Sequence, residues 1–248
     1  MDIIVYTSNS SKDNLVQWKT KDHTEKITRM KNMQDVADVS PKVKIISIDF
    51  GADFGLDNDM SPVYKADFIR IYKMHEHGGI WFDFDILFIK PIPCFFFESD
   101  DTDLFCFLWA DSKTKYATFT TGFTASIPKL PFFRELLKKA LQALKSPTST
   151  DYMKIGPDLW KQTFLDMKLF NNRRLKRVSN QTVYPYDWLQ ITEFVTTNID
   201  RVSDDTFCIH WFNGNNEIRK VENEIDIENI DKTKSTLHKY LHNVFTTI

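Results

Sequence analysis

The chain has 248 residues and a formal net charge of −2, and 42% of its residues are hydrophobic, 14% aromatic and 27% charged. This composition is typical of a globular protein with a bulky core and excludes a disordered chain, since Phe occurs 21 times against 7 Gly. The lack of a basic excess argues against a general nucleic-acid-binding protein.

The N-terminal residues are predicted to begin an alternation of strands and helices. The segment "IIVYTS" at 3–8 predicts a short buried strand, and polar helical material follows to about residue 38. "KVKIISIDF" at 42–50 predicts a second strand, and "GADFGLDNDM" at 51–60 predicts a loop.

A helix is predicted between Ser61-Pro62 and Gly78-Gly79. Serine is a good N-cap, proline suits the first helical position, and glycine readily takes the left-handed conformation that ends a helix. Apolar and aromatic residues recur at helical spacing and should face the core: Tyr64, Phe68, Ile71, Tyr72 and His75.

The rest of the chain continues the alternation. Strands are predicted near 103–109, 117–126 and 205–212, and helices near 131–145, 156–168 and 232–245. This order predicts an α/β fold with a mostly parallel central sheet flanked by helices, in a single domain over residues 1–248. The charged segment "NEIRKVENEIDIENIDKTK" predicts a solvated face or a mobile approach to the last helix.

The location of the protein is predicted from what the sequence lacks. "MDIIVYTSNS" has neither the basic region nor the long apolar region of a signal peptide, and no run of about 18 apolar residues could span a membrane. Cys94, Cys106 and Cys208 have no metal-type spacing and are interpreted as free, buried thiols. We therefore expect a soluble cytoplasmic protein.

The run from Ile80 to Ile89 is predicted to be a strand buried on both faces, yet it contains Asp83 and Asp85. Alternate residues of a strand share a face, so the two carboxylates would repel each other unless a cation lay in front of them. Oxygen ligands of this kind suit Mn²⁺ or Mg²⁺, whose other positions are often filled by phosphate oxygens. The pair therefore predicts a metal site for a diphosphate-bearing ligand.

Asp67 and Arg70 lie three residues apart on the preceding helix and so share a face. One interpretation is a surface salt bridge of little energetic value. The other is that both face the same ligand as the two aspartates, because ligands of open α/β sheets bind outside the carboxyl ends of the strands.

The string "ADFIRIYKMHEHGGIWFDFDILFIKPI", residues 66 to 92, resembles the sugar-nucleotide-binding segment of the DxD glycosyltransferases of family 32. That group includes yeast-type initiating mannosyltransferases, capsular polysaccharide transferases and, more distantly, the catalytic domains of the large clostridial toxins. The resemblance continues in the same order to about residue 214, in four segments: "TGFTASIPKLPFF", "IGPDLW", "VYPYDW" and "CIHWFNG".

The resemblance implies a GT-A fold with a nucleotide-sugar-binding half at about 1–92, an acceptor half at about 93–215 and a charged helical segment at about 216–248. Asp85 would bind the metal directly, Asp83 would contact the donor and the metal, and His210 would add a ligand. Asp67 and Arg70 would hold the donor sugar and diphosphate. Asp83, Asp85 and Arg70 would thus be the catalytic residues.

Further candidate binding residues lie elsewhere in the chain. Tyr6, Thr7 and Ser8 end the first strand, where backbone groups and an aromatic ring can bind the base of the donor. Trp188, Trp211 and Asp158 are candidates for acceptor binding, although a tryptophan is more often a core residue. Many relatives have Asn where this chain has Thr121, so recognition of the donor sugar is expected to differ.

The predicted function is transfer of a sugar from a nucleotide-diphosphate sugar to a hydroxyl of a glycan or other acceptor, with Mn²⁺ or Mg²⁺ as cofactor. The family is retaining, a UDP-sugar is favoured and a GDP-sugar is the alternative. Two other classes stay open: a non-catalytic sugar-nucleotide or glycan-binding relative, and a haloacid-dehalogenase-type phosphatase. The short chain suggests a minimal catalytic module from a bacterium or a virus.

Overall fold

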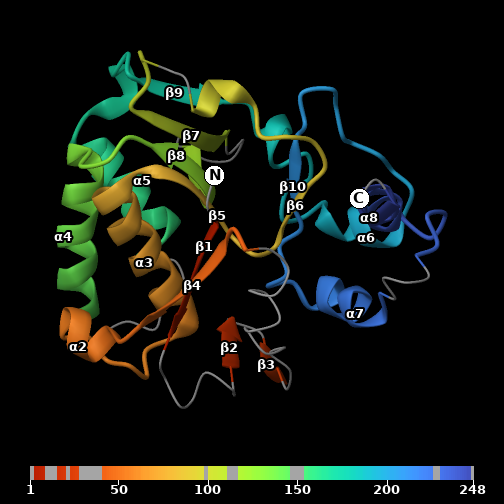
Figure 1. Ribbon diagram of the computed structural model, residues 1–248, viewed down its shortest axis with the longest axis horizontal. Coiled ribbons are helices and arrows are strands. Elements are labelled where there is room, and N and C mark those ends of the chain that lie inside the picture. The colour runs from red at the N-terminus through yellow and green to blue at the C-terminus, as the bar shows by residue number, and fades with distance from the viewer. Residues whose placement is uncertain are drawn as a thin grey trace. The chain divides into compact units, whose positions relative to one another are not determined.

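The computed structural model describes residues 3–8, 16–20, 23–27, 41–97, 100–110, 117–145, 154–225 and 230–246. The chain divides into two compact units (Figure 1). The first comprises Met1–His77 with Pro128–Phe170, and the second comprises Gly78–Ile127 with Asn171–Ile248. These bounds differ from the predicted halves, because the chain returns to the first unit after residue 127.

In the first unit, β1 (Ile3–Ser8) pairs in parallel with β4 (Val43–Ile48). Four helices also belong to the described part of this unit: α2 (Phe50–Phe54), α3 (Pro62–His77), α4 (Pro131–Lys145) and α5 (Pro157–Asp166). Helices α3 and α4 lie side by side (Figure 1). Phe132 and Phe133 of α4 contact the buried Trp160 of α5 with edge-to-face geometry, so aromatic packing joins the two helices.

The predicted strand at 3–8 and helix at 61–79 are both found. Helix α3 begins at Pro62, and Gly78 and Gly79 follow its last residue with φ angles of 60° and 85°. Only glycine takes these angles without strain, which explains why the helix ends there. The strand, however, is less buried than predicted, because Ile3 and Ile4 are 37% and 44% exposed.

The prediction of helical material before residue 38 is wrong where the structure describes this segment. Residues Val16–Thr20 (β2) and His23–Ile27 (β3) form an antiparallel pair instead. Two residues separate these strands, a length that favours a hairpin over a helix. The other residues of the predicted helical segment lie outside the described part of the chain.

The second unit contains a four-stranded sheet in the order β5-β8-β7-β9. Its strands are β5 (Gly79–Phe82), β7 (Leu104–Ala110), β8 (Ala117–Ser126) and β9 (Leu175–Val178). A separate antiparallel pair joins β6 (Ile86–Phe88) to β10 (Cys208–His210). One cluster of buried aromatic side chains in this unit includes Phe96, Phe107, Phe123 and Phe207.

The α/β class, with helices flanking a sheet, is confirmed, and parallel ladders join β1 to β4 and β7 to β9. The sheets are nevertheless more mixed than predicted, since β8 is antiparallel to both β5 and β7. Only residues 111–116 separate β7 from β8, and so short a connection can join only antiparallel strands.

The predicted single strand from Ile80 to Ile89 is two strands that belong to different ladders. β5 pairs with β8, the chain turns at Asp83–Asp85, and β6 pairs with β10. Phe84 lies in this turn and is 72% exposed, so the prediction that it is a core residue is wrong. The aspartates flank a turn and do not share the face of a continuous strand.

The C-terminal part of the second unit is helical. Helices α6 (Ile191–Thr196), α7 (Asn216–Glu224) and α8 (Thr236–Thr246) follow in chain order, with short 3-10 turns at Cys94–Phe96, Leu169–Asn171 and Asn180–Thr182 elsewhere in the chain. The predicted last helix is confirmed, and part of the charged segment is the helix α7, which buries Ile218. Among the described helices, none combines the length and the apolar character needed to cross a membrane. Cys106 and Cys208 are buried as predicted, whereas Cys94 is exposed.

Candidate metal centre

Asp83, Asp85 and His210 meet in the second unit, and one ligand atom from each lies within 4.8 Å of those of the other two. Asp83 follows the last residue of β5, Asp85 precedes β6, and His210 is the last residue of β10. The structure therefore brings together the three residues that the sequence predicted as metal ligands.

Backbone pairing explains why residues so far apart in the sequence meet. The backbone N–H of Asp83 donates to the carbonyl of Gly122 at 2.8 Å, which extends the β5–β8 ladder by one bond. His210 is the ladder partner of Ile86, and the N–H of Trp211 donates to the carbonyl of Asp85 at 3.0 Å. The two ladders thus fix the two ends of the turn that carries the aspartates.

Asp85 is held at both of its carboxylate oxygens. Its Oδ1 lies 2.9 Å from Nε2 of His210, and its Oδ2 accepts a 3.0 Å hydrogen bond from the backbone N–H of Asn213. Burial alone would raise the pKa of Asp85, but the neighbouring His210 and the amide of Asn213 outweigh burial and lower it. The carboxylate form, which a metal ion requires, is therefore the favoured form at neutral pH.

Asp83 is oriented by the indole of Trp81, whose Nε1–H donates to its Oδ1 at 2.8 Å. Its other oxygen lies beside Gly122. A Cβ atom added to Gly122 would lie 3.2 Å from both Oδ2 of Asp83 and Cε1 of His210. Gly122 therefore provides the space in which the carboxylate and the imidazole approach each other.

His210 is enclosed by aromatic rings. The ring of Phe212 lies 4.1 Å from the imidazole, centroid to centroid, and the ring of Tyr184 lies 5.5 Å away. An ionised carboxylate only accepts hydrogen bonds, so Nε2 carries the hydrogen in its contact with Asp85. Nδ1 is buried and makes no hydrogen bond within the described part of the chain. A buried imidazole nitrogen of this kind beside two carboxylates fits a metal ligand.

Asp67 and Arg70 belong to the first unit, not to the unit that holds this cluster. Their side chains form an ion pair and are only 8% and 4% exposed, respectively. The surface-salt-bridge interpretation is therefore wrong, because the pair is buried. Gly156 contributes to its enclosure, since an added Cβ there would lie 2.8 Å from Oδ2 of Asp67. Donor binding by Asp67 and Arg70 stays a prediction.

Tyr6, Thr7 and Ser8 end β1 as predicted, and they also belong to the first unit. Burial raises the pKa of the Tyr6 hydroxyl, and the ammonium of Lys73 lies 5.0 Å from its ring centroid. Sequence analysis missed Lys65, a buried residue of α3 whose Nζ donates to Oγ of Ser8 at 2.8 Å. The position of Lys65 in the helical pattern did not indicate that its side chain is buried and reaches the end of β1.

The three candidate acceptor residues lie in different surroundings. Trp188 is 47% exposed, whereas Trp211 packs against a buried cluster that includes Tyr186 and Ile209. Asp158 is exposed in the first turn of α5, in the first unit. Of these three residues, Trp188 is thus the tryptophan whose ring is accessible, and the acceptor role of all three stays a prediction.

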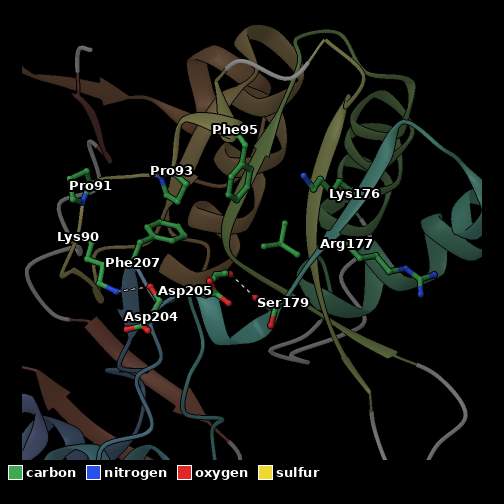
Figure 2. Close-up of a pocket in the computed structure, with 12 residues that line it drawn as sticks. Lys90, Pro91, Pro93, Phe95, Lys176, Arg177, Ser179, Asp204, Asp205 and Phe207 are labelled. Carbon is green, nitrogen blue, oxygen red and sulfur yellow. Dashed lines mark hydrogen bonds between the residues drawn. The ribbon is translucent and has the colours of Figure 1, made fainter.

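A pocket of about 510 Å³ is present in the second unit, lined by segments around Lys90, Lys176 and Asp205 (Figure 2). It adjoins Phe207 and Lys90, where β10 begins and β6 has ended, so it lies at the opposite end of the β6–β10 ladder from His210. Two of its cations already have partners: Nζ of Lys90 donates to the carbonyl of Asp204, and Nζ of Lys176 lies over the ring of Phe95. The pocket and the metal centre are separate features.

This chain is thus an α/β protein with a candidate divalent-metal centre. The centre consists of two carboxylates and an imidazole at the junction of two ladders. The chain belongs to the capsular polysaccharide synthesis protein family, whose model matches residues 53–223. The matched segment contains all three residues of the cluster.

Among solved structures, the chain is similar to one described as "PaToxG Glycosyltransferase", with a TM-score of 0.39 and 15% sequence identity. The alignment covers 57% of this chain and 54% of that chain, so the present chain matches about half the length of that structure. No curated protein matches the chain.

Proposed function

We propose that this protein is a metal-dependent glycosyltransferase that moves a sugar from a nucleotide-diphosphate sugar to a hydroxyl of a glycan or other acceptor. The observation that carries the proposal is the convergence of Asp83, Asp85 and His210 in a member of the capsular polysaccharide synthesis family. A polysaccharide is built by forming glycosidic bonds, and paired carboxylates that hold a hard cation suit a diphosphate leaving group.

Asp83, Asp85 and His210 would hold the metal ion. Two carboxylates with an imidazole favour Mn²⁺ over Mg²⁺, because Mg²⁺ prefers oxygen ligands alone. A bound cation would neutralise the negative charge that develops on the departing diphosphate. Asp85 is already ionised and held at both oxygens by this chain, so little reorganisation is needed for it to act as a ligand.

In the proposed reaction, the bond between the anomeric carbon and the diphosphate oxygen breaks, and the acceptor oxygen bonds to the same face of the sugar. The acceptor proton passes to the departing nucleoside diphosphate, and the configuration at the anomeric carbon is retained. Arg70, Asp67 and the end of β1 at Tyr6, Thr7 and Ser8 are proposed to bind the donor. A UDP-sugar is the favoured donor and a GDP-sugar the alternative.

The proposal is tested by incubating the protein with a panel of UDP- and GDP-sugars, with and without Mn²⁺. We expect release of the nucleoside diphosphate that depends on Mn²⁺, and a thermal shift with the same donor. A ligand at about 100 times its dissociation constant should stabilise the protein by roughly 2.7 kcal/mol. A thermal shift without any release of nucleoside diphosphate would favour a non-catalytic sugar-nucleotide-binding protein instead.

Gly122→Ala is expected to weaken Mn²⁺ binding about tenfold or more, because its Cβ would lie 3.2 Å from Oδ2 of Asp83 and Cε1 of His210. A shift of a few tenths of an ångström in either group spoils a metal site while leaving the fold intact. Isothermal titration with Mn²⁺ measures the change. Gly214→Ala is the matched control, since its Cβ would make only an ordinary contact of 3.8 Å with Trp188. Equal Mn²⁺ affinities in both variants would contradict the placement of the metal.

His210→Ala is expected to weaken Mn²⁺ affinity about tenfold or more, because it removes one of the three proposed ligands. A purely structural histidine gives a different result: lower thermal stability with an unchanged Mn²⁺ midpoint. Titration of Mn²⁺ against both proteins at a fixed donor concentration separates the two. The control is His238→Ala, which removes another buried histidine of the same unit, one whose Nδ1 pairs with Ser235.

A further inference from the structure

The backbone at Phe212, two residues beyond the proposed ligand His210, is strained. Phe212 has a φ angle of 50°, in the left-handed region that bulky residues rarely occupy. Such strain persists only where the surrounding structure imposes it, and it is found most often at functional sites. The conformation of Phe212 therefore requires an explanation.

Asp85 imposes this conformation from both sides. Its backbone carbonyl accepts from the N–H of Trp211, and its Oδ2 accepts from the N–H of Asn213. The residue between these two anchored amides has little freedom to relax. The residue that is proposed to bind the metal thus also anchors the backbone on both sides of Phe212.

The ring of Phe212 contacts two other rings. Its centroid lies 4.1 Å from that of His210 and 5.7 Å from that of Trp188, and the planes of the Phe212 and Trp188 rings make an angle of 86°. Trp188 therefore stands edge to face on Phe212, one ring away from the metal centre. We refer to Trp188 and Phe212 together as the aromatic shelf.

Trp188 is exposed although it does not lie on a loosely held loop. Its side chain is 47% exposed, and the adjacent Leu189 is 86% exposed. Oδ1 of Asp187 accepts hydrogen bonds of 2.8 Å from the backbone N–H groups of both Leu189 and Gln190, which fixes the turn. A large aromatic residue held rigidly in contact with water, beside a polar centre, is typical of a ligand-binding site.

We propose that the aromatic shelf binds a sugar ring of the acceptor glycan, with the ring stacked on the exposed face of Trp188. The inference rests on the proposed function and adds to it a residue that determines acceptor specificity. A pyranose has an apolar face of C–H groups that suits a tryptophan ring, while its hydroxyls remain available to water and to polar groups. Phe212 acts as a positioning residue, because it supports Trp188 and does not itself need to contact the sugar.

The test uses the intact protein labelled with ¹⁵N, in which the indole N–H signal of Trp188 is assigned by its loss in Trp188→Phe. The probes are the methyl glycosides of glucose, galactose, mannose and N-acetylglucosamine, with glycerol as a polyol control. We expect at least one glycoside, but not glycerol, to shift the Trp188 signal. Trp188→Ala should weaken binding of that glycoside about tenfold, and Trp188→Phe should weaken it less, because a smaller ring remains. Leu189→Ala should leave it unchanged.

Mn²⁺-dependent cleavage of the donor by water is measured in the same proteins. We expect Trp188→Ala to lower it much less than it lowers glycoside binding, since water replaces the glycan as acceptor, and we expect Leu189→Ala to leave it unchanged. The proposal that the shelf binds the acceptor would be overturned if no glycoside shifted the Trp188 signal. It would also be overturned if Trp188→Ala reduced donor cleavage as much as glycoside binding. Absence of donor cleavage in the wild type, with the Trp188 shift present, would instead overturn the proposed function and support the shelf as a glycan-binding site.

Discussion

Asp85→Asn is expected to abolish Mn²⁺-dependent donor binding and to reduce turnover at least a hundredfold, a loss on the order of 3 kcal/mol of transition-state stabilisation. An amide is a poor ligand for a hard cation and carries no charge. The side chain keeps its shape, so its oxygen can still accept from the N–H of Asn213. Nucleoside diphosphate release at saturating donor, with and without Mn²⁺, measures the effect.

The stability of Asp85→Asn is expected to fall rather than rise. Repulsion between two carboxylates on one strand face would have made the change stabilising, but Asp85 lies in a turn and is paired with His210. Loss of this charge-assisted contact should cost roughly 1–3 kcal/mol. Urea unfolding at neutral pH measures it, and the fold should survive.

Asp103→Asn is the matched control for this variant. It makes the same chemical change in the same unit, at an ion pair with the exposed Arg174 on the surface. Activity and Mn²⁺ affinity should equal those of the wild type. Full turnover by Asp85→Asn, or an equal loss in both variants, would remove Asp85 from the proposed metal site.

Arg70→Ala is expected to destabilise the protein by about 3–5 kcal/mol, because it removes the guanidinium that forms an ion pair with the buried carboxylate of Asp67. Had the pair been on the surface, the cost would have been at most about 1 kcal/mol. Urea unfolding of the two proteins gives the difference in the free energy of unfolding. Arg70→Lys keeps the charge and provides a measurable variant where Arg70→Ala unfolds.

Two further variants test whether the burial of the ion pair explains the large loss of stability expected for Arg70→Ala. Lys138→Ala removes the partner of Glu135 in an exposed pair with the same spacing, on α4 of the same unit, and should cost little. The double change Asp67→Asn with Arg70→Met should recover part of the stability lost in Arg70→Ala, because no uncompensated charge remains buried. A cost for Arg70→Ala no larger than that for Lys138→Ala would show that burial does not govern this pair.

The donor-binding role of Arg70 requires its own measurement, since destabilisation alone can lower activity. Arg70→Lys should be measured under conditions in which it is fully folded. Lysine cannot form the paired hydrogen bonds of a guanidinium with the sugar nucleotide, so turnover should fall while Mn²⁺ affinity is kept. Wild-type turnover by Arg70→Lys would argue that the pair has a structural role only.

The sequence by itself determined the elements with strong local signals and the residues that form the candidate metal centre. Ser61-Pro62 and the glycines at 78 and 79 determined the ends of α3, since proline and glycine act through their own backbone angles. Helix α4 was likewise predicted at its observed bounds, 131–145. The spacing of Asp83 and Asp85 selected the two carboxylates, and the resemblance of the segment "CIHWFNG" to the family added His210, so all three residues that meet were selected from the sequence.

The tertiary structure alone decided how those residues are presented. Local pattern could not show that the apolar run from 80 to 89 changes ladder at the aspartates, because the partners β8 and β10 lie about 40 and 120 residues further along the chain. The burial of the Asp67–Arg70 pair depends on Gly156, which follows it by almost 90 residues. The left-handed backbone of Phe212, whose ring contacts those of His210 and Trp188, depends on hydrogen bonds that the neighbouring N–H groups of Trp211 and Asn213 donate to the distant Asp85. These features rest on long-range pairing and packing, which the order of residues in a short segment does not encode.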